Sequence, residues 1–66
     1  MVKYYSVLRP IGIGTFPKYA DNKVIDIVNF DKRIYCDEIG REAWGYLVYE
    51  SEMSDKDALS YDLIKA

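Results

Sequence analysis

Apolar residues gather in three segments that have the composition of β-strands. The segments are rich in Val, Ile, Tyr and Phe and are bounded by residues that favour turns. They span residues 2–8, 24–30 and 43–50. The first segment ends before Pro10, which has no amide hydrogen to donate to a strand ladder. The pattern therefore predicts three strands, with an ordered loop between the first and the second.

Side chains alternate between the two sides of a strand, so their order predicts which ones share a side. Ile25 and Ile27 point one way in the second segment, whereas Val28 and Phe30 point the other way beside Asp26. Because both sides are partly apolar, we expect residues 24–30 to form a central strand.

The third segment also has two apolar sides. Trp44, Tyr46 and Val48 share one side, and Leu47 and Tyr49 share the other. No other side chain in the chain covers as much area as that of Trp44, so we expect Trp44 at the centre of the core. The alternative is an exposed pair of Arg41 and Trp44, since both residue types are enriched among binding anchors.

The stretch between the second and third segments is open to two interpretations. Residues 29–33 have the composition of a turn, after which residues 34–36 form a short returning strand. In the rival interpretation Asp31 caps a helix over residues 32–43, but Gly40 would interrupt that helix. We favour the turn, followed by a bend or one helical turn around residues 37–42.

The last segment predicts one short helix. Ser54 can accept the amide of Asp57, and Asp55 and Asp57 favour the positive end of a helix dipole. A helix over residues 55–60 and a closing edge strand over residues 61–64 follow. The expected fold is α+β, a small antiparallel sheet of three to five strands with one short helix near the C-terminus, in a single domain over residues 1–66.

Composition excludes several kinds of chemistry. The chain has no histidine and only one cysteine, so Ser-His and Cys-His catalysis, thiolate or imidazole zinc sites and an internal disulfide are excluded. Cys36 lies beside Asp37 and Glu38, which raise a thiol pKa, and it is expected to be packed rather than reactive. A lone cysteine without an export signal or membrane span fits the cytoplasm.

Two other patterns have simple structural interpretations. Gly12 and Gly14 follow a strand, but they lack the remaining residues of a phosphate-binding loop and are expected to form a turn. Acidic residues gather between Glu50 and Asp57 without the spacing of an EF-hand loop. We therefore expect no metal and no cofactor.

Tyrosine is the one strong compositional excess, with seven residues in 66. Tyrosine suits both strands and binding surfaces, because its ring offers area and its hydroxyl can stay wet. The candidate interaction residues are Tyr4, Tyr5, Tyr19, Tyr35, Arg41, Trp44, Tyr46 and Tyr49. The tyrosines could pack in the core or form an exposed interaction face, and both alternatives remain open. A core this small would rarely bury seven tyrosine hydroxyls that all have hydrogen-bond partners.

Charge is distributed unevenly along the chain. Residues 1–36 carry six bases and three acids, and residues 37–66 carry three bases and eight acids, for a net charge of −2. The basic half could bind nucleic acid through Lys3, Arg9, Lys18 and Arg33 with stacked tyrosines. The net negative charge argues against general DNA binding.

Four segments carry a resemblance to a known group of proteins. Residues 4–10, 14–17, 29–31 and 38–45 resemble small uncharacterised proteins of phages and conjugative elements of gut Firmicutes. These are similar to domains associated with large polyvalent proteins, some linked to defence against restriction. The resemblance implies an accessory role on mobile DNA and brings no catalytic residue with it.

The sequence thus predicts a non-enzymatic module that binds a protein partner. Self-association is a second expectation, because a domain of this length buries only about 60% of its unfolded surface and is marginally stable alone. The alternative function is nucleic-acid binding by the basic, tyrosine-rich half.

Overall fold

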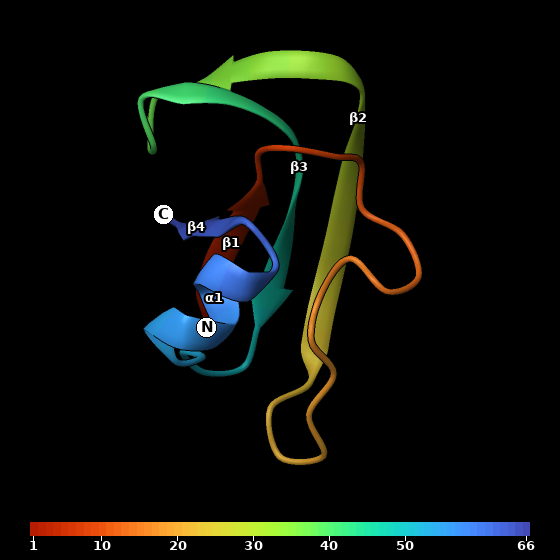
Figure 1. Cartoon of the computed structure of the whole chain (residues 1–66), viewed down its shortest axis with the longest axis vertical. Helices are drawn as coiled ribbons and strands as arrows, with labels where there is room; N and C mark the ends of the chain where they lie inside the picture. Colours follow the sequence, from red (N-terminus) through yellow and green to blue (C-terminus); the bar gives the residue numbers. More distant parts are fainter.

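The computed structural model describes residues 1–66, which form four strands and one helix. The elements are β1 (Val2–Ser6), β2 (Val24–Cys36), β3 (Arg41–Tyr49), α1 (Asp55–Ser60) and β4 (Leu63–Lys65). Figure 1 shows β2 running the height of the molecule and bending over at the top into its hairpin with β3. The expected α+β architecture is confirmed.

The four strands form one antiparallel sheet in the order β2-β3-β1-β4. In this order β3 and β1 are central, and β2 and β4 are the edges. The prediction of a central strand over residues 24–30 was therefore wrong. Ile25 and Ile27, which suggested a second buried side, are 49% and 45% exposed.

The turn predicted over residues 29–33 is instead part of β2. The strand continues through this stretch, but its pairing is irregular: Asn29 pairs with Gly45 and Ile34 pairs with Ala43. Residues 30–33 therefore face a single residue of β3, Trp44, and the three extra residues form an irregular bulge where β2 bends. The returning strand over residues 34–36 forms as the end of β2, and the rival helix over residues 32–43 is wrong.

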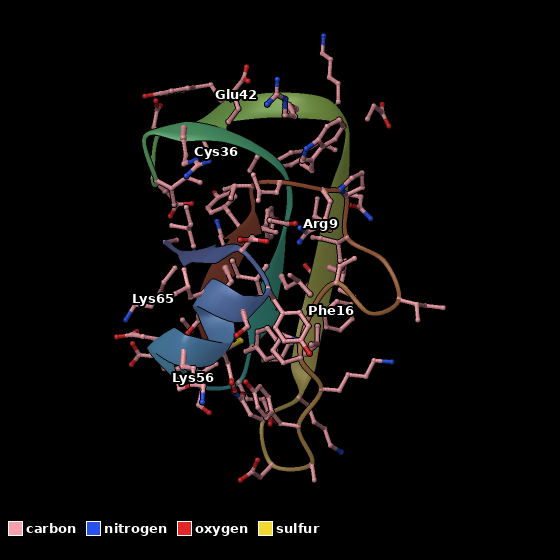
Figure 2. All side chains as sticks on the ribbon, viewed as in Figure 1. Arg9, Phe16, Cys36, Glu42, Lys56 and Lys65 are labelled. Atoms are coloured by element: carbon pink, nitrogen blue, oxygen red, sulfur yellow. The ribbon has the colours of Figure 1, made fainter.

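The first core cluster lies on the side of the sheet covered by α1 and the loop over residues 7–23, here called the helix face. Tyr4, Leu47 and Tyr49 project from the central strands into this cluster, and Met53 and Leu63 pack against them. Phe16 of the loop packs onto the same cluster and points back toward the sheet (Figure 2). Tyr4, Leu47 and Tyr49 are at most 1% exposed, so these three residues form the centre of the core.

The second cluster lies on the opposite side, here called the hairpin face. Tyr5 and Val7 of the first segment contact Cys36 and Ala43, because the end of the β2–β3 hairpin folds over them. Trp44 lies on neither cluster and is only partly buried. The expectation that Trp44 is the centre of the core was wrong, since α1 and the loop cover the helix face near Leu47 and Tyr49.

Local signals explain most element ends. Ser54 caps α1 by accepting the amide of Asp57, so the predicted helix over residues 55–60 is confirmed. The Gly12 carbonyl accepts the amide of Thr15 in the predicted turn, and Gly14 adopts a positive φ of 83° that favours glycine.

Two strand ends differ from the prediction. The first strand ends at Ser6, two residues early, because the Ser6 hydroxyl donates to the Arg9 carbonyl and turns the chain. The closing strand lies over Leu63–Lys65 rather than residues 61–64, because Asp62 in the left-handed region (φ 55°) ends the helical turn.

α1 has six residues, and none of the chain's helices is long and apolar enough to cross a membrane.

Candidate protein-interaction surface

Three of the candidate tyrosines belong to the core. Tyr4, Tyr5 and Tyr49 are 1%, 6% and 0% exposed, so they cannot form the exposed face considered from the sequence. Their hydroxyls are satisfied inside the chain: the Met53 amide donates to Tyr4 Oη, and Tyr49 Oη donates to the Pro17 carbonyl. Burial raises the pKa of Tyr49 above its usual range. These tyrosines hold the β3–α1 connection and the loop against the sheet.

Tyr5 takes part in a network that ties the tip of the β2–β3 hairpin to β1. Tyr5 Oη donates to Glu38 Oε1 at 2.5 Å, and Lys3 Nζ donates to the same oxygen at 2.9 Å. Lys3 Nζ also lies 4.6 Å from the ring centroid of Tyr46, another candidate, which is partly buried. The two hydrogen bonds, that from Tyr5 first, lower the pKa of Glu38. Lys3, Tyr5 and Tyr46 therefore form an internal latch with Glu38 rather than an open site.

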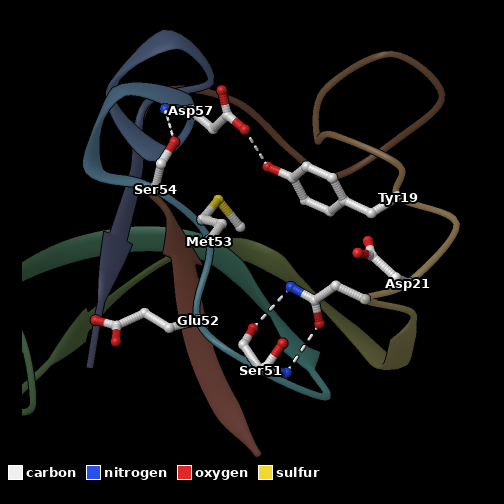
Figure 3. Close-up of a pocket in the computed structure, with 8 residues that line it drawn as sticks. Tyr19, Asp21, Ser51, Glu52, Met53, Ser54 and Asp57 are labelled. Carbon is white, nitrogen blue, oxygen red and sulfur yellow. Dashed lines mark hydrogen bonds between the residues drawn. The ribbon is translucent and has the colours of Figure 1, made fainter.

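Tyr19 lines a polar hollow of about 220 Å³ between the loop and the start of α1 (Figure 3). Its hydroxyl donates to the carboxylate of Asp57, and burial, followed by this hydrogen bond, raises the pKa of Tyr19 to about 12. Asn22 joins the two walls, because its amide group donates to the Ser51 carbonyl and accepts the Ser51 amide, both at 2.8 Å. The polar groups of this hollow mainly fasten the loop to the β3–α1 connection.

The acidic residues near this hollow do not converge on one point. Glu52 pairs with Lys65, Glu50 accepts the amide of Lys23, and Asp57 accepts from Tyr19. No group of three or more potential metal ligands occurs in the structure.

Tyr35 differs from the other candidate tyrosines because it is 60% exposed. It belongs to a set of large apolar side chains that β2 presents to solvent, here called the β2 apolar row. The row comprises Ile25, Ile27, Ile34 and Tyr35, which are 49%, 45%, 44% and 60% exposed. Half of the eight exposed large hydrophobic residues of the chain belong to this one strand. Ile25 and Ile27 precede the bulge and Ile34 and Tyr35 follow it, and the consecutive side chains of Ile34 and Tyr35 point to opposite sides of the strand. So many exposed apolar side chains on one edge strand make β2 the candidate for contact with a partner.

Arg41 and Trp44 do not form the exposed pair considered from the sequence. The guanidinium of Arg33 lies 6.0 Å from the Trp44 ring, and the same guanidinium is 3.6 Å from Glu42. Arg41 instead lines a small groove on the other side of the molecule together with Leu8, Leu59 and Ile64. Trp44 therefore flanks the β2 apolar row, whereas Arg41 belongs to a separate surface.

The backbone edge of β2 is partly closed by its own side chain. Glu50 donates its amide to the Lys23 carbonyl, so Lys23 faces β3. The register shift between Val24 and Asp26 then turns Asp26 toward β3 and the amide of Ile27 away from it. Asp26 Oδ1 accepts this amide at 2.9 Å. A charged residue that occupies an edge amide opposes the addition of another strand. We infer that the β2 apolar row is suited to side-chain contacts more than to strand pairing.

The cations proposed for nucleic-acid binding are mostly engaged with acids. Lys3 pairs with Glu38, Arg9 pairs with Asp62 at 3.0 Å, and Arg33 pairs with Glu42. Of the four, Lys18 alone has no ion pair, and its ammonium lies 6.0 Å from the Phe16 ring. These pairs reduce the positive field that a phosphate backbone would meet.

Cys36 is buried and 8% exposed, as expected. Burial raises the pKa of the thiol, and the charges of Glu38 and Asp37 raise it further. The sulfur is therefore held in its protonated form, in which it is a poor nucleophile.

The sequence did not single out Ile25, Ile27 or Ile34 as surface residues. Their apolar character indicated burial, and only the position of β2 at the edge of the sheet exposes them. One signal was present: Asp26, Asp31 and the two bases Lys32 and Arg33 interrupt the apolar run, which is typical of an edge strand.

Comparison with known proteins gives one result. The sequence model of one protein family, described as defence against restriction A C-terminal, matches residues 1–66. The match confirms the resemblance to domains linked to defence against restriction. No curated protein and no solved structure matches the chain.

Proposed function

Because the chain belongs to the defence against restriction A C-terminal family, we propose that it is a non-enzymatic protein-interaction module that assists a mobile genetic element against restriction. In this role it binds a protein partner through the β2 apolar row. The partner covers apolar side chains of the row, Tyr35 among them, and excludes water from them. The lone buried Cys36 suits the reducing cytoplasm, where we expect this contact to form.

The observation that carries this proposal is the exposure of four large apolar side chains on one strand. Leaving such side chains in water costs about 25 cal/mol per Å² of apolar surface, and a partner that covers them recovers that free energy. Tyr35 has the properties of a binding anchor, because its ring is large and rigid and its hydroxyl makes no hydrogen bond within the chain.

Charged side chains divide and flank the row. Lys32 and Asp31 lie between its two halves and have no ion-pair partner in the chain, and Arg33 covers Trp44. A partner that contacts both halves of the row must therefore also meet these charges. The partner is thus expected to offer apolar side chains with both acidic and basic neighbours.

A capture experiment tests the proposal. The tagged protein and its Ile34→Ser, Tyr35→Ser double variant are used to capture proteins from the host lysate, with and without nuclease. Ile13→Ser is the matched control, because Ile13 is 97% exposed and belongs to the loop rather than to β2. We expect the double variant to lose at least 90% of the captured partner, while the control and the nuclease-treated sample retain it.

Two results would reject the proposal. Equal capture by the double variant and the wild-type protein would exclude the β2 apolar row. Capture that disappears with nuclease would instead favour nucleic-acid binding through the basic half.

A further inference from the structure

The second edge of the sheet, β4, differs from β2 because its backbone is open. The Ala66 amide donates to the Lys3 carbonyl at 2.9 Å, and Tyr5 pairs with Ile64 in the same register. In an antiparallel ladder, alternate residues turn their amide and carbonyl groups to the same neighbour. Ile64 and Ala66 therefore face β1, and Leu63 and Lys65 direct their amides and carbonyls to the open side. No side chain of the molecule bonds to these groups, in contrast to the Ile27 amide on β2.

The outward-directed amides and carbonyls of Leu63 and Lys65 are spaced so that they can pair with the same groups of a second copy related by a two-fold rotation. When a second copy of β4 lies antiparallel with Ile64 of both copies on the axis, Leu63 of one copy is opposite Lys65 of the other. Leu63 and Lys65 both direct their backbone groups outward. The amide of each residue can therefore donate to the carbonyl of the other, which gives two hydrogen bonds for the pair. The rotation generates the same pair a second time, as in an isologous dimer. A shift of the register by one residue would oppose outward-facing groups with inward-facing ones.

Apolar side chains beside β4 would be covered by the same arrangement. Leu59 at the end of α1 is 77% exposed and Leu8 is 57% exposed, although both lie next to buried Leu63. With Val7 and Ile64 they line a groove of about 170 Å³ at the start of β4. A second hollow at the end of β4 shares Leu59, Leu63 and Ile64 with this groove. The open backbone edge is therefore bordered by these two hollows, here together called the trough.

Charge at the two ends of the trough is complementary. Arg41 lines the groove at the start of β4, and Asp55 lines the hollow at its end. Neither side chain has an ion-pair or hydrogen-bond partner in the chain, whereas Arg9 is paired with Asp62 and Lys65 with Glu52. The two-fold rotation reverses β4, so the Arg41 end of one copy lies beside the Asp55 end of the other. A copy of the same chain thus supplies opposite charge at both ends.

We propose that two copies of this chain associate through β4, with the two-fold axis at Ile64, into one continuous antiparallel sheet. Leu8 and Leu59 are covered at the seam, and Arg41 of each copy pairs with Asp55 of the other. The β2 apolar rows remain free at the two outer edges of the joined sheet. This association is independent of the proposed function, which uses the opposite edge.

Sedimentation equilibrium over micromolar to millimolar concentration tests the association. The wild-type chain is expected at twice its mass of 7.7 kDa at the upper end of this range. Lys65→Pro removes one outward amide without removing a bond to β1, so we expect its dissociation constant to rise at least tenfold. Lys65→Ala is the matched control, because it loses the same side chain and the same pair with Glu52 but keeps the amide. A monomeric wild type at millimolar concentration, or an equal effect of both variants, would overturn the proposal.

A charge exchange gives a second test that does not depend on a proline. Arg41→Asp alone and Asp55→Arg alone each place like charges across the seam and should weaken the dimer. The double variant restores opposite charges and should recover the wild-type dissociation constant within about threefold. Additive weakening in the double variant would overturn the proposed orientation. The Ile34→Ser, Tyr35→Ser variant is expected to dimerise normally, which separates this test from that of partner capture.

Discussion

The rings of Tyr4 and Tyr49 meet edge to face, with centroids 5.8 Å apart and an interplanar angle of 88°. They come from neighbouring central strands, and each uses its hydroxyl to hold a different segment. Tyr4 accepts the amide of Met53, and Tyr49 donates to the carbonyl of Pro17. The core of the helix face is thus organised around two tyrosines whose polar ends fix the chain that covers them.

Removing either hydroxyl should destabilise the fold without emptying the core. Tyr4→Phe leaves a buried amide without an acceptor, and Tyr49→Phe leaves a buried carbonyl without a donor. We expect each change to lower the free energy of unfolding by about 1–2 kcal/mol, measured by urea denaturation. Tyr35→Phe is the control, because the Tyr35 hydroxyl has no partner in the chain, and it should leave the midpoint unchanged. An equal effect at all three positions would contradict this account.

Gly45 allows β2 and β3 to approach each other beside the bulge. A Cβ atom built at Gly45 would lie 2.3 Å from the Val28 carbonyl oxygen and 3.0 Å from the Asn29 Cα, both backbone atoms that cannot move aside freely. Gly45→Ala should therefore lower the free energy of unfolding by about 1–3 kcal/mol, as overpacking does. Gly12→Ala is the control, because nothing lies within 4 Å of the added atom. A stable Gly45→Ala variant would show that the strands pair differently here.

The latch between Glu38, Tyr5 and Lys3 makes part of the stability depend on pH. Because the folded chain lowers the pKa of Glu38 below its ordinary 4.5, the contribution is complete above that pH. It is lost as the pH falls through the folded pKa. Glu38→Gln should therefore unfold at lower urea than the wild type at pH 7, and the difference should disappear at the acid end.

The neighbouring carboxylate provides the control for the latch. Asp37 lies in the same turn but makes no hydrogen bond or ion pair in the chain, so Asp37→Asn should behave like the wild type at every pH. A difference between wild type and Glu38→Gln that persists undiminished into acid would contradict the latch.

Asp26 protects the edge of β2 by accepting the Ile27 amide. Asp26→Ala should free this amide and remove a charge from an edge that already exposes Ile25 and Ile27, so aggregation at high concentration should increase. Asp31→Ala removes a charge from the same strand without freeing an amide and serves as the control. Light scattering over time compares the two, and equal rates would contradict a specific role for Asp26.

Local signals predicted the elements well where a single residue decides the outcome. Ser54 and the two aspartates after it specify the start of α1, and the β-branched and aromatic residues of β1 and β3 favour strands. The charges of Asp37 and Glu38 also indicated the direction of the thiol pKa shift of Cys36, in addition to the larger effect of burial. These features depend on contacts within a few residues of the chain.

Features that depend on the order of strands in the sheet could not be predicted from local sequence signals. The two apolar sides of residues 24–30 suggested a central strand, but β1 pairs with β3 and with β4, which leaves β2 at the edge. Leu47 and Tyr49, rather than Trp44, form the centre of the core, because α1 and the loop cover the side of β3 opposite to the Trp44 side chain. The exposure of Ile25, Ile27 and Ile34, and hence the candidate site, follows from these long-range choices.

A photo-crosslinking experiment at Tyr35 tests whether β2 carries the binding surface. Tyr35→benzoylphenylalanine places a reactive group of similar shape in the β2 apolar row, and Lys56→benzoylphenylalanine places the same group on exposed α1 as the control. After irradiation in host cells, we expect one protein to be crosslinked to position 35 and to be absent from position 56. The same protein should be lost when Ile34→Ser is added. No protein adduct at position 35, or equal adducts at both positions, would contradict the claim that β2 carries the binding surface.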